Sequence, residues 1–232
     1  MSQLQAWVRR ALWDVVPRDQ RDSAAAFRRR QVVAAIVVLV GACVLGWSLR
    51  LEPGGNTFYV AAIVLAGVWA VGAFFSGRLH LGRMARGTEV FVRPILAPIL
   101  LGLLLVGIFV LGSLVVREIP PLATYVRSVL EYADEGSLTL LAVITFFNGI
   151  AEELFFRGAM YAAIPRRPVL WTTLAYVVAT LATGNVMLAF AAILLGAVCG
   201  LERRASGGVL APILTHITWS LSMLFLLPLL FA

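Results

Sequence analysis

The sequence has little charge and contains no lysine. Only 13% of its 232 residues are charged, whereas 61% are hydrophobic and the mean hydropathy is +0.92. A soluble domain is about 45–50% apolar and about 25% charged. A soluble globule of this size could not bury so much apolar surface, and a disordered chain would not carry it. The composition therefore predicts an all-α polytopic membrane protein.

Cysteine and histidine are also scarce. Cys43 and Cys199 are the only cysteines, and both lie in apolar runs, so no disulfide framework is expected. The two histidines are His80, in an arginine-rich connection, and His216, in an apolar run. We expect His80 to be a solvated surface residue. A site that requires several imidazoles is therefore hard to build from this chain.

Seven apolar runs predict one bundle of about seven transmembrane helices, over residues 32–232. The fifth and sixth runs are short, with roughly 16 residues or about 24 Å of helix, against a hydrocarbon core of about 30 Å. The turn Gly184–Asn185 between them is expected to lie below the outer surface, covered by protein or hydrated. The runs are 32–49, 57–77, 94–116, 138–163, 169–183, 186–201 and 208–231.

Arginine asymmetry predicts the orientation of this bundle. If residues 1–31 are a cytoplasmic arginine-rich segment, fifteen arginines lie on the inner side and three on the outer side. The inner set includes Arg86, Arg203 and Arg204. We therefore expect an integral protein of a bacterial plasma membrane, with a cytoplasmic N-terminus and an outer C-terminus. We attribute the net charge of +7 to this orientation and to anionic lipid headgroups, and we expect no nucleic-acid partner.

The outer connection 117–137 is the longest. Two prolines open it, and apolar residues then recur at helical spacing, with Glu131, Asp134 and Glu135 on the polar side. This pattern predicts a short surface-lying helix that serves as a lid or a packing element.

The fourth run contains charges that are expensive in a membrane. Glu152, Glu153 and Arg157 lie within it, and each costs roughly 3 kcal/mol unless it is paired or hydrated. Glu153 and Arg157 are four residues apart and are predicted to form an ion pair. Glu152 points about 100° away, one turn from Asn148, which can offer it a hydrogen bond. An unpaired carboxylate suits a general base, although one buried network that only fixes helix packing is the alternative.

His216 lies in the seventh run, with Ser220 one helical turn further on. Glu152 lies roughly 16 Å from the inner boundary of its run and His216 roughly 12 Å from its own. Two titratable groups at similar depth predict a shared polar cavity that opens towards the cytoplasm. A histidine that only bonds to a neighbouring helix is the alternative.

These residues resemble two motifs of the CPBP family, the CAAX-protease and bacteriocin-processing (Abi) intramembrane peptidases. The first motif, Glu-Glu-x-x-x-Arg, matches residues 152–157, and the third, His-x-x-x-Asn/Asp, matches 216–220 with serine at the last position. The similarity covers residues 138–225. It departs at the second motif, Phe-x-x-x-His, because the matching stretch 176–180 runs from Tyr176 to Thr180 and contains no histidine.

The resemblance implies a role for each residue. Glu152 would activate a water for attack on a peptide carbonyl, and Glu153 and Arg157 would hold the site in place. His216 and Ser220 would donate hydrogen bonds to the developing oxyanion. Thr180 could hold a water but could not accept a proton as an imidazole does.

Some family members are labelled metalloproteases, so a divalent metal such as zinc is one possible cofactor. Catalytic zinc takes three protein ligands. Only Glu152 and His216 are good candidates here, so a metal is short of ligands and no cofactor is assigned.

Three functions remain open. The first is a CPBP-family (CAAX protease-like) intramembrane endopeptidase that hydrolyses a peptide or membrane-protein substrate through a Glu-activated water. The second is a weakened or inactive relative that binds a peptide or lipid-modified partner in the same cavity. The third is a proton-coupled transporter, which the absence of an internal duplication disfavours. The sequence sets no oligomeric state.

Overall fold

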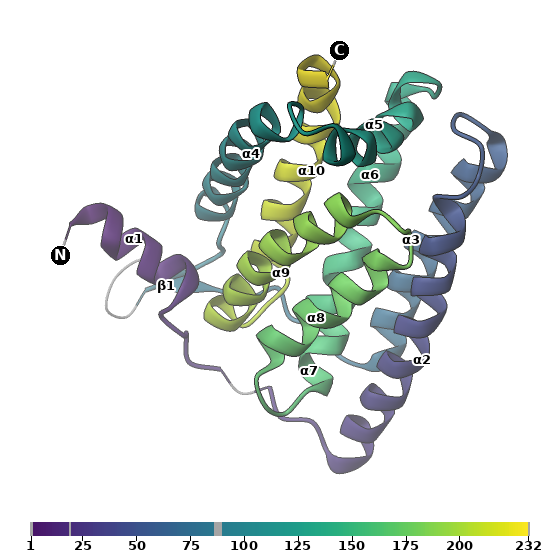
Figure 1. Ribbon diagram of the computed structural model, residues 1–232. Coiled ribbons are helices and arrows are strands. Elements are labelled where there is room, and N and C mark those ends of the chain that lie inside the picture. Colours follow the sequence, from purple (N-terminus) through teal and green to yellow (C-terminus); the bar gives the residue numbers. More distant parts are fainter. Residues whose placement is uncertain (1, 19, 86–89, 232) are drawn as a thin grey trace.

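The computed structural model describes residues 2–18, 20–85 and 90–231, so Arg86, one of the arginines counted for the orientation, lies outside the described residues. The described chain is almost entirely helical, which confirms the predicted fold class (Figure 1). Its one described sheet is a two-residue antiparallel pairing of β1 (Met84–Ala85) with β2 (Phe91–Val92).

Six described helices are long and apolar enough to cross a membrane, and one further apolar helix is shorter. Each of the seven overlaps one of the predicted apolar runs. The shorter helix is α8, whose 14 residues span about 21 Å. The long ones are α2 (Ala24–Ser48), α3 (Asn56–Ser76), α4 (Leu96–Val116), the segment Leu138–Ala163, α9 (Val186–Ser206) and α10 (Leu210–Phe231), and α8 is Pro168–Leu181.

Two of these helices extend further than their apolar runs. Ser23 caps α2, so this helix begins well before residue 32 and carries arginines in its first turns. The sixth run was expected to be short, and this expectation is wrong. α9 continues through Glu202 and Arg203, because both side chains are buried against other helices and find polar partners there.

The fourth span changes its helical type where the charged motif lies. It consists of α6 (Leu138–Glu153), the π-helical segment η1 (Leu154–Met160) and the single turn α7 (Tyr161–Ala163). A π-helical turn is rare and is frequently found at functional sites. The turn begins directly after Glu153 and contains Arg157.

This span lies at the centre of the bundle. Figure 1 shows α6 and α10 in the middle, with α8 and α9 in front of them, α2 and α3 on one side and α4 on the other. Trp69 of α3 packs against η1, with ring centroids 4.9 Å from Phe155 and 5.0 Å from Phe156. The three rings are almost fully buried. This aromatic cluster fixes η1 against α3.

The outer connection forms the predicted helix, α5 (Pro120–Asp134). It covers the turn between α8 and α9, because Asn185 Nδ2 donates to the Tyr125 carbonyl at 2.7 Å. Asn185 also caps α9 through its Oδ1. Gly184, before it, adopts a φ of 77°, which glycine accepts without strain. Asn185 is thus buried beneath α5, whereas Gly184 is exposed.

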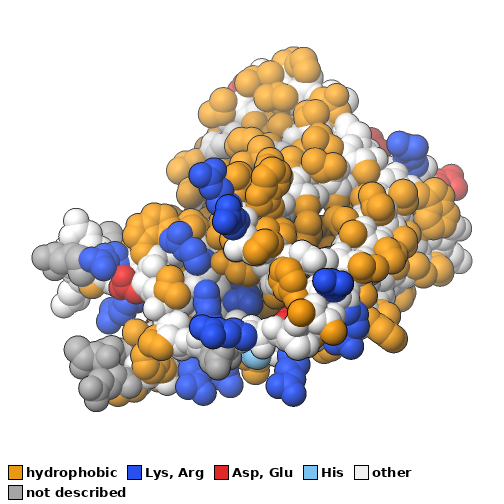
Figure 2. Space-filling view, turned by 90° about the horizontal axis from the view of Figure 1, so that it is seen from below, with side chains coloured by type: hydrophobic (Ala, Val, Ile, Leu, Met, Phe, Trp, Pro, Cys, Tyr) orange, Lys and Arg blue, Asp and Glu red, His pale blue; other side chains and the backbone are white. Residues whose placement is uncertain are grey.

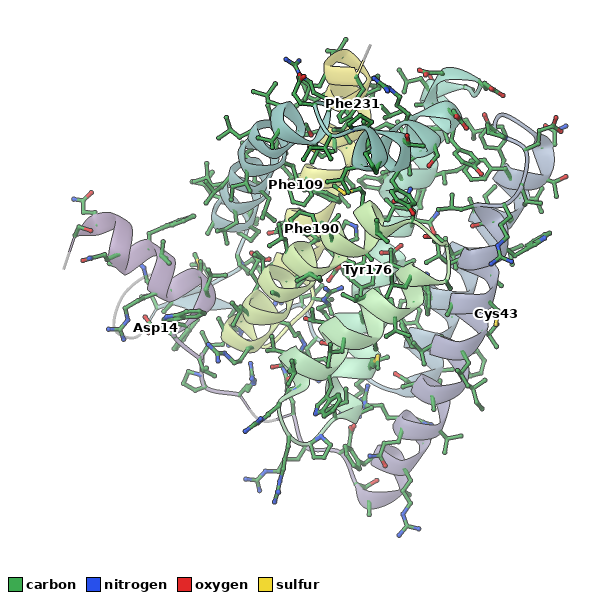
Figure 3. All side chains as sticks on the ribbon, in the orientation of Figure 1. Asp14, Cys43, Phe109, Tyr176, Phe190 and Phe231 are labelled. Atoms are coloured by element: carbon green, nitrogen blue, oxygen red, sulfur yellow. The ribbon has the colours of Figure 1, made fainter. Side chains whose placement is uncertain are left out.

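The outward faces of the helices are apolar. Leu39 of α2, Phe75 of α3 and Leu111 of α4 are each about two-thirds exposed or more, as expected of side chains that face lipid. Cys43 lies on the outer side of α2 (Figure 3) and Cys199 is buried in α9, and both are free, so no disulfide joins them.

The N-terminal segment is folded onto the same end of the bundle as the start of α10. Helix α1 (Gln3–Leu12) contacts α9. In the irregular segment that follows, the Val16 amide donates to the Ala205 carbonyl at 3.1 Å. Arg204 of α9 donates to the Leu12 carbonyl and stacks on Trp13. These contacts hold residues 13–18 against the end of α9.

Candidate functional site

The buried carboxylate of Glu153 connects two helices. Its Oε1 accepts from Arg157 Nη1 at 2.9 Å, which confirms the pairing expected from the spacing. The same oxygen lies 2.8 Å from His216 Nδ1 of α10. An ionised carboxylate only accepts, so Nδ1 carries the hydrogen of this bond. Glu153 therefore sets both the tautomer and the position of His216.

The pair is deeply buried, with no exposed side-chain surface on either Glu153 or Arg157. Breaking such a pair strands a charge in an apolar medium. The guanidinium also lies over the Tyr176 ring, with Cζ 4.9 Å from its centroid. Gly196 of α9 leaves it room, since a Cβ there would lie 3.4 Å from Nη2. The surrounding helices are thus shaped around this guanidinium.

Glu152 has a different environment. Its Oε2 accepts from the Tyr176 hydroxyl of α8 at 2.7 Å, and the residue retains some exposed surface, unlike its neighbour. The expectation that Asn148 supports it is wrong. Asn148 Nδ2 instead donates to the Ala62 and Ile144 carbonyls, because α3 packs closely on that face of α6.

His216 packs against the backbone of α6. A Cβ at Gly149 would lie 3.6 Å from the imidazole Cδ2, so this glycine allows α6 and α10 to approach each other. Glu153 holds Nδ1, and no described residue bonds to Nε2. The imidazole thus keeps one nitrogen available for a ligand.

Ser220 and Thr180 are near the site but are not joined to it. The Ser220 Oγ is buried and has no hydrogen-bond partner among the described residues. The Thr180 hydroxyl donates to the Tyr176 carbonyl, four residues earlier in α8, at 2.8 Å. Thr180 is therefore one helical turn from the tyrosine that bonds to Glu152, but its own hydroxyl is used within α8.

Two features beside the site were not predicted from the sequence. Tyr176 was noted only as the aromatic residue of a motif, and the available signal was its position one turn before Thr180. Arg203 was assigned to a cytoplasmic connection, which is wrong. Its side chain is buried in α9, and its Nε donates to the Arg157 carbonyl at 2.7 Å. The wide π-helical turn leaves this carbonyl free to accept.

A third buried carboxylate lies close by. Glu202 Oε1 accepts from the Thr215 hydroxyl of α10 at 2.9 Å, and this hydroxyl lies 3.0 Å from the Pro98 carbonyl of α4. These contacts join α4, α9 and α10 one residue before His216. Glu202 therefore supports the helix that carries the histidine.

The side chains of the site do not form a ligand set for a zinc ion. The described residues contain no group of three histidine, cysteine, aspartate or glutamate side chains arranged to hold a metal. In addition, Glu153 Oε1 and His216 Nδ1 are bonded to each other. No metal-dependent step is derived for this site.

Comparison with known proteins finds a similarity that covers the segment carrying the site. Residues 134–222 match the model of a family described as Rce1-like, type II CAAX prenyl endopeptidase Rce1-like. A search of curated proteins and a search of solved structures gave no match. The matched segment contains Glu152, Glu153, Arg157, Thr180 and His216, and it confirms the predicted resemblance. It supports a CAAX protease-like intramembrane peptidase in general, in an integral membrane protein.

Removing one partner of the buried pair should destabilise the bundle. We expect Arg157→Met to lower the free energy of unfolding in detergent by about 3–5 kcal/mol, because Glu153 loses its cation. Arg117→Met, which removes an exposed partner of Glu118, should cost less than about 1 kcal/mol.

A second variant separates charge from packing. Replacing both partners, as Glu153→Leu with Arg157→Met, should recover part of the lost stability, because no buried charge is then left alone. Equal losses in the single and the double variant would show that the side chains stabilise by shape alone.

Proposed function

We propose that this chain is an intramembrane endopeptidase in which Glu152 activates the attacking water. The observation that carries the proposal is the unequal environment of the two adjacent carboxylates. Glu153 is fully buried and bound by Arg157 and His216, whereas Glu152 is partly exposed and bound only by Tyr176. A base must be reached by a water, and of the two carboxylates Glu152 is the one that retains exposed surface.

The reaction follows from the atoms that remain available. A water bound to Glu152 loses a proton to the carboxylate while its oxygen attacks the peptide carbonyl carbon. The carbonyl oxygen becomes an oxyanion, and the Nε2 hydrogen of a protonated His216, whose Nδ1 hydrogen goes to Glu153, stabilises it. The tetrahedral intermediate then collapses, and the proton held by Glu152 passes to the leaving amine nitrogen.

Charge balance supports this division of roles. Glu152 and Glu153 carry two negative charges when ionised, and Arg157 carries one positive charge. In a medium of low dielectric constant, the group is most stable when it has no net charge. One additional proton achieves this, and it can reside on His216 or on Glu152. With this proton on His216, Glu152 is ionised and can accept a proton from the water, while both imidazole nitrogens carry a hydrogen.

Tyr176 positions the base. Its hydroxyl donates to one oxygen of Glu152 and leaves the other oxygen for the water. Its ring meanwhile contacts the Arg157 guanidinium, so one side chain of α8 fixes both the base and its supporting ion pair. Ser220, with its unpartnered hydroxyl, is the second candidate donor to the oxyanion.

A second function is favoured by one observation. The Thr180 hydroxyl donates to its own helix, so the position where the family motif has histidine offers no proton acceptor to the site. A chain with this deficiency could bind a peptide or a lipid-modified partner in the same place without cleaving it. An enzyme needs the carboxylate of Glu152 to cleave a peptide, whereas a binding protein would show no cleavage with or without it.

The first test removes this carboxylate. We expect Glu152→Gln to lower cleavage of a peptide library in detergent by about 100-fold or more, because the amide cannot accept the proton of the water. Glu131→Gln, an equal change on the surface helix α5, should leave cleavage unchanged. If neither the unchanged protein nor the variant cleaves any peptide, and both bind peptides equally, the binding function replaces the enzymatic one.

The second test supplies the missing imidazole. We expect Thr180→His to raise the cleavage rate about tenfold, because a histidine one turn from Tyr176 can share the proton that Glu152 takes from the water. Thr183→His, the same substitution in the turn after α8, should have no effect. An unchanged rate in a folded Thr180→His protein would remove position 180 from the proposed site.

We also propose that residues 1–31 are cytoplasmic and that the C-terminus is outside, with His216 in the inner half of the membrane. A membrane-impermeant maleimide should label Arg127→Cys in intact cells and Arg28→Cys only after permeabilisation, because the two exposed positions lie at opposite ends of the bundle. Cys43→Ser and Cys199→Ser provide the background. Labelling in the reverse order would invert the orientation.

A further inference from the structure

A cavity whose lining does not include Glu152 or Glu153 lies at the end of the bundle where α2 begins and α9 ends. It has a volume of about 570 Å³, which is large enough for a small polar group and several waters. Figure 2 looks onto this end of the molecule and shows arginine side chains gathered over it. The N-terminal segment, α2, the connection after α3, α7 and α9 all contribute to its wall.

Positive charge dominates this wall. Arginines from four separate parts of the chain line the cavity, and Asp22 is the one acidic residue among the described lining residues. Asp22 is already bonded to Arg30 Nε at 2.8 Å, so it neutralises one cation and leaves the others. The lining arginines are Arg18, Arg21, Arg30, Arg78 and Arg203.

Arg203 is the most informative of these residues. It is 4% exposed, and its Nε donates to the Arg157 carbonyl while its guanidinium lies 4.8 Å from the Tyr161 ring centroid. Within residues 2–18, 20–85 and 90–231, no acceptor bonds to its Nη1. A buried guanidinium N–H without an acceptor is costly. This group therefore presents an unused donor to a cavity in which Asp22, the one acidic side chain among the described lining residues, is already paired with Arg30.

The segment around His80 closes the cavity on one side. The His80 carbonyl accepts from the Val209 amide at 2.8 Å, which holds this connection against the start of α10. Burial lowers the pKa of His80 below its usual value near 6.5, and Arg203 and Arg30 lower it further. Arg78 acts in the same direction and Asp22 against it. The pKa of His80 is thus sensitive to the positive charge in the cavity.

We infer that this cavity binds a phosphate group, either the headgroup phosphate of a membrane lipid or free phosphate. Several guanidinium groups converge on it from different directions, which matches the several oxygens of a phosphate better than the two oxygens of a single carboxylate. The cavity also lies at an end of the bundle, where the lipid phosphates of one leaflet are found. The inference does not depend on whether the chain cleaves peptides.

Binding at this cavity would reach the candidate active site through one residue. A phosphate on Arg203 Nη1 would hold a guanidinium whose Nε donates to the carbonyl of Arg157. Arg157 in turn donates to Glu153. An occupied cavity would therefore stabilise the π-helical turn on which the buried ion pair depends.

The test measures thermal unfolding and the titration of His80 in the full chain. In one experiment, inorganic phosphate is added to the detergent-solubilised protein, with sodium chloride at matched ionic strength as the reference. In the other, the protein is placed in phosphatidylcholine nanodiscs with and without phosphatidic acid. A ligand of the folded state raises the unfolding temperature and does so saturably. NMR resolves His80 readily, because the chain contains only two histidines.

A bound anion should raise the unfolding temperature and the pKa of His80, because it offsets the charge of Arg203 and Arg30. Sulfate, whose charge is constant over the titration, should give the same shift as phosphate. An effect of phosphate in detergent identifies a site open to free anions, and an effect of phosphatidic acid alone identifies a lipid site. If neither ligand changes either quantity, the inference is wrong.

Matched variants distinguish a built site from general attraction to a basic surface. Arg21→Gln with Arg78→Gln should weaken the affinity about tenfold or more, because both side chains line the cavity. Arg28→Gln with Arg29→Gln removes the same charge from the exposed start of α2, outside the cavity, and should change the affinity less than about twofold. Equal losses in the two pairs would overturn the inference. Arg203→Met should abolish binding, and the Arg21/Arg78 pair decides the outcome if that variant does not fold.

Discussion

The structure depends on one buried carboxylate. Glu153 has no contact with solvent and shares a single oxygen between Arg157 of its own span and His216 of α10. A charge in this position is tolerated only because its partners compensate it, so the three side chains must come together for the bundle to form. The same requirement places His216 with Nδ1 occupied and Nε2 available. Stability and candidate chemistry therefore depend on the same contact.

The π-helical turn sets the surroundings of Arg157. Because η1 starts directly after Glu153, the residues that follow are displaced from regular α-helical positions, and Arg157 is enclosed by Tyr176, Gly196 and the aromatic cluster. The turn also frees the Arg157 carbonyl for Arg203. A regular helix would bond this carbonyl internally. The local irregularity thus links the site in the bundle to the arginine-lined cavity at its end.

Some of this arrangement was predictable from local spacing. Glu153 and Arg157 are four residues apart in an apolar run, so a helix brings them together whatever surrounds it. The spans follow from the length of apolar runs in the same way. Arg203 was misplaced because charge at the end of an apolar run was taken as the end of the helix. Its burial depends on a carbonyl 46 residues earlier in the chain, which no local pattern reveals.

The sequence by itself determined the environment, the helical class and the inventory of reactive groups. Apolar composition requires a membrane, and a membrane requires helices that satisfy their own backbone. Two glutamates, one arginine and one histidine are the acidic and basic side chains available in the spans with the motifs. Only the tertiary structure decided which group contacts which. Tyr176 and Glu152 are 24 residues apart on separate helices, and His216 is 63 residues from Glu153. Such pairings depend on helix rotation and crossing, which are set by side-chain packing across the whole bundle and not by periodicity within one segment.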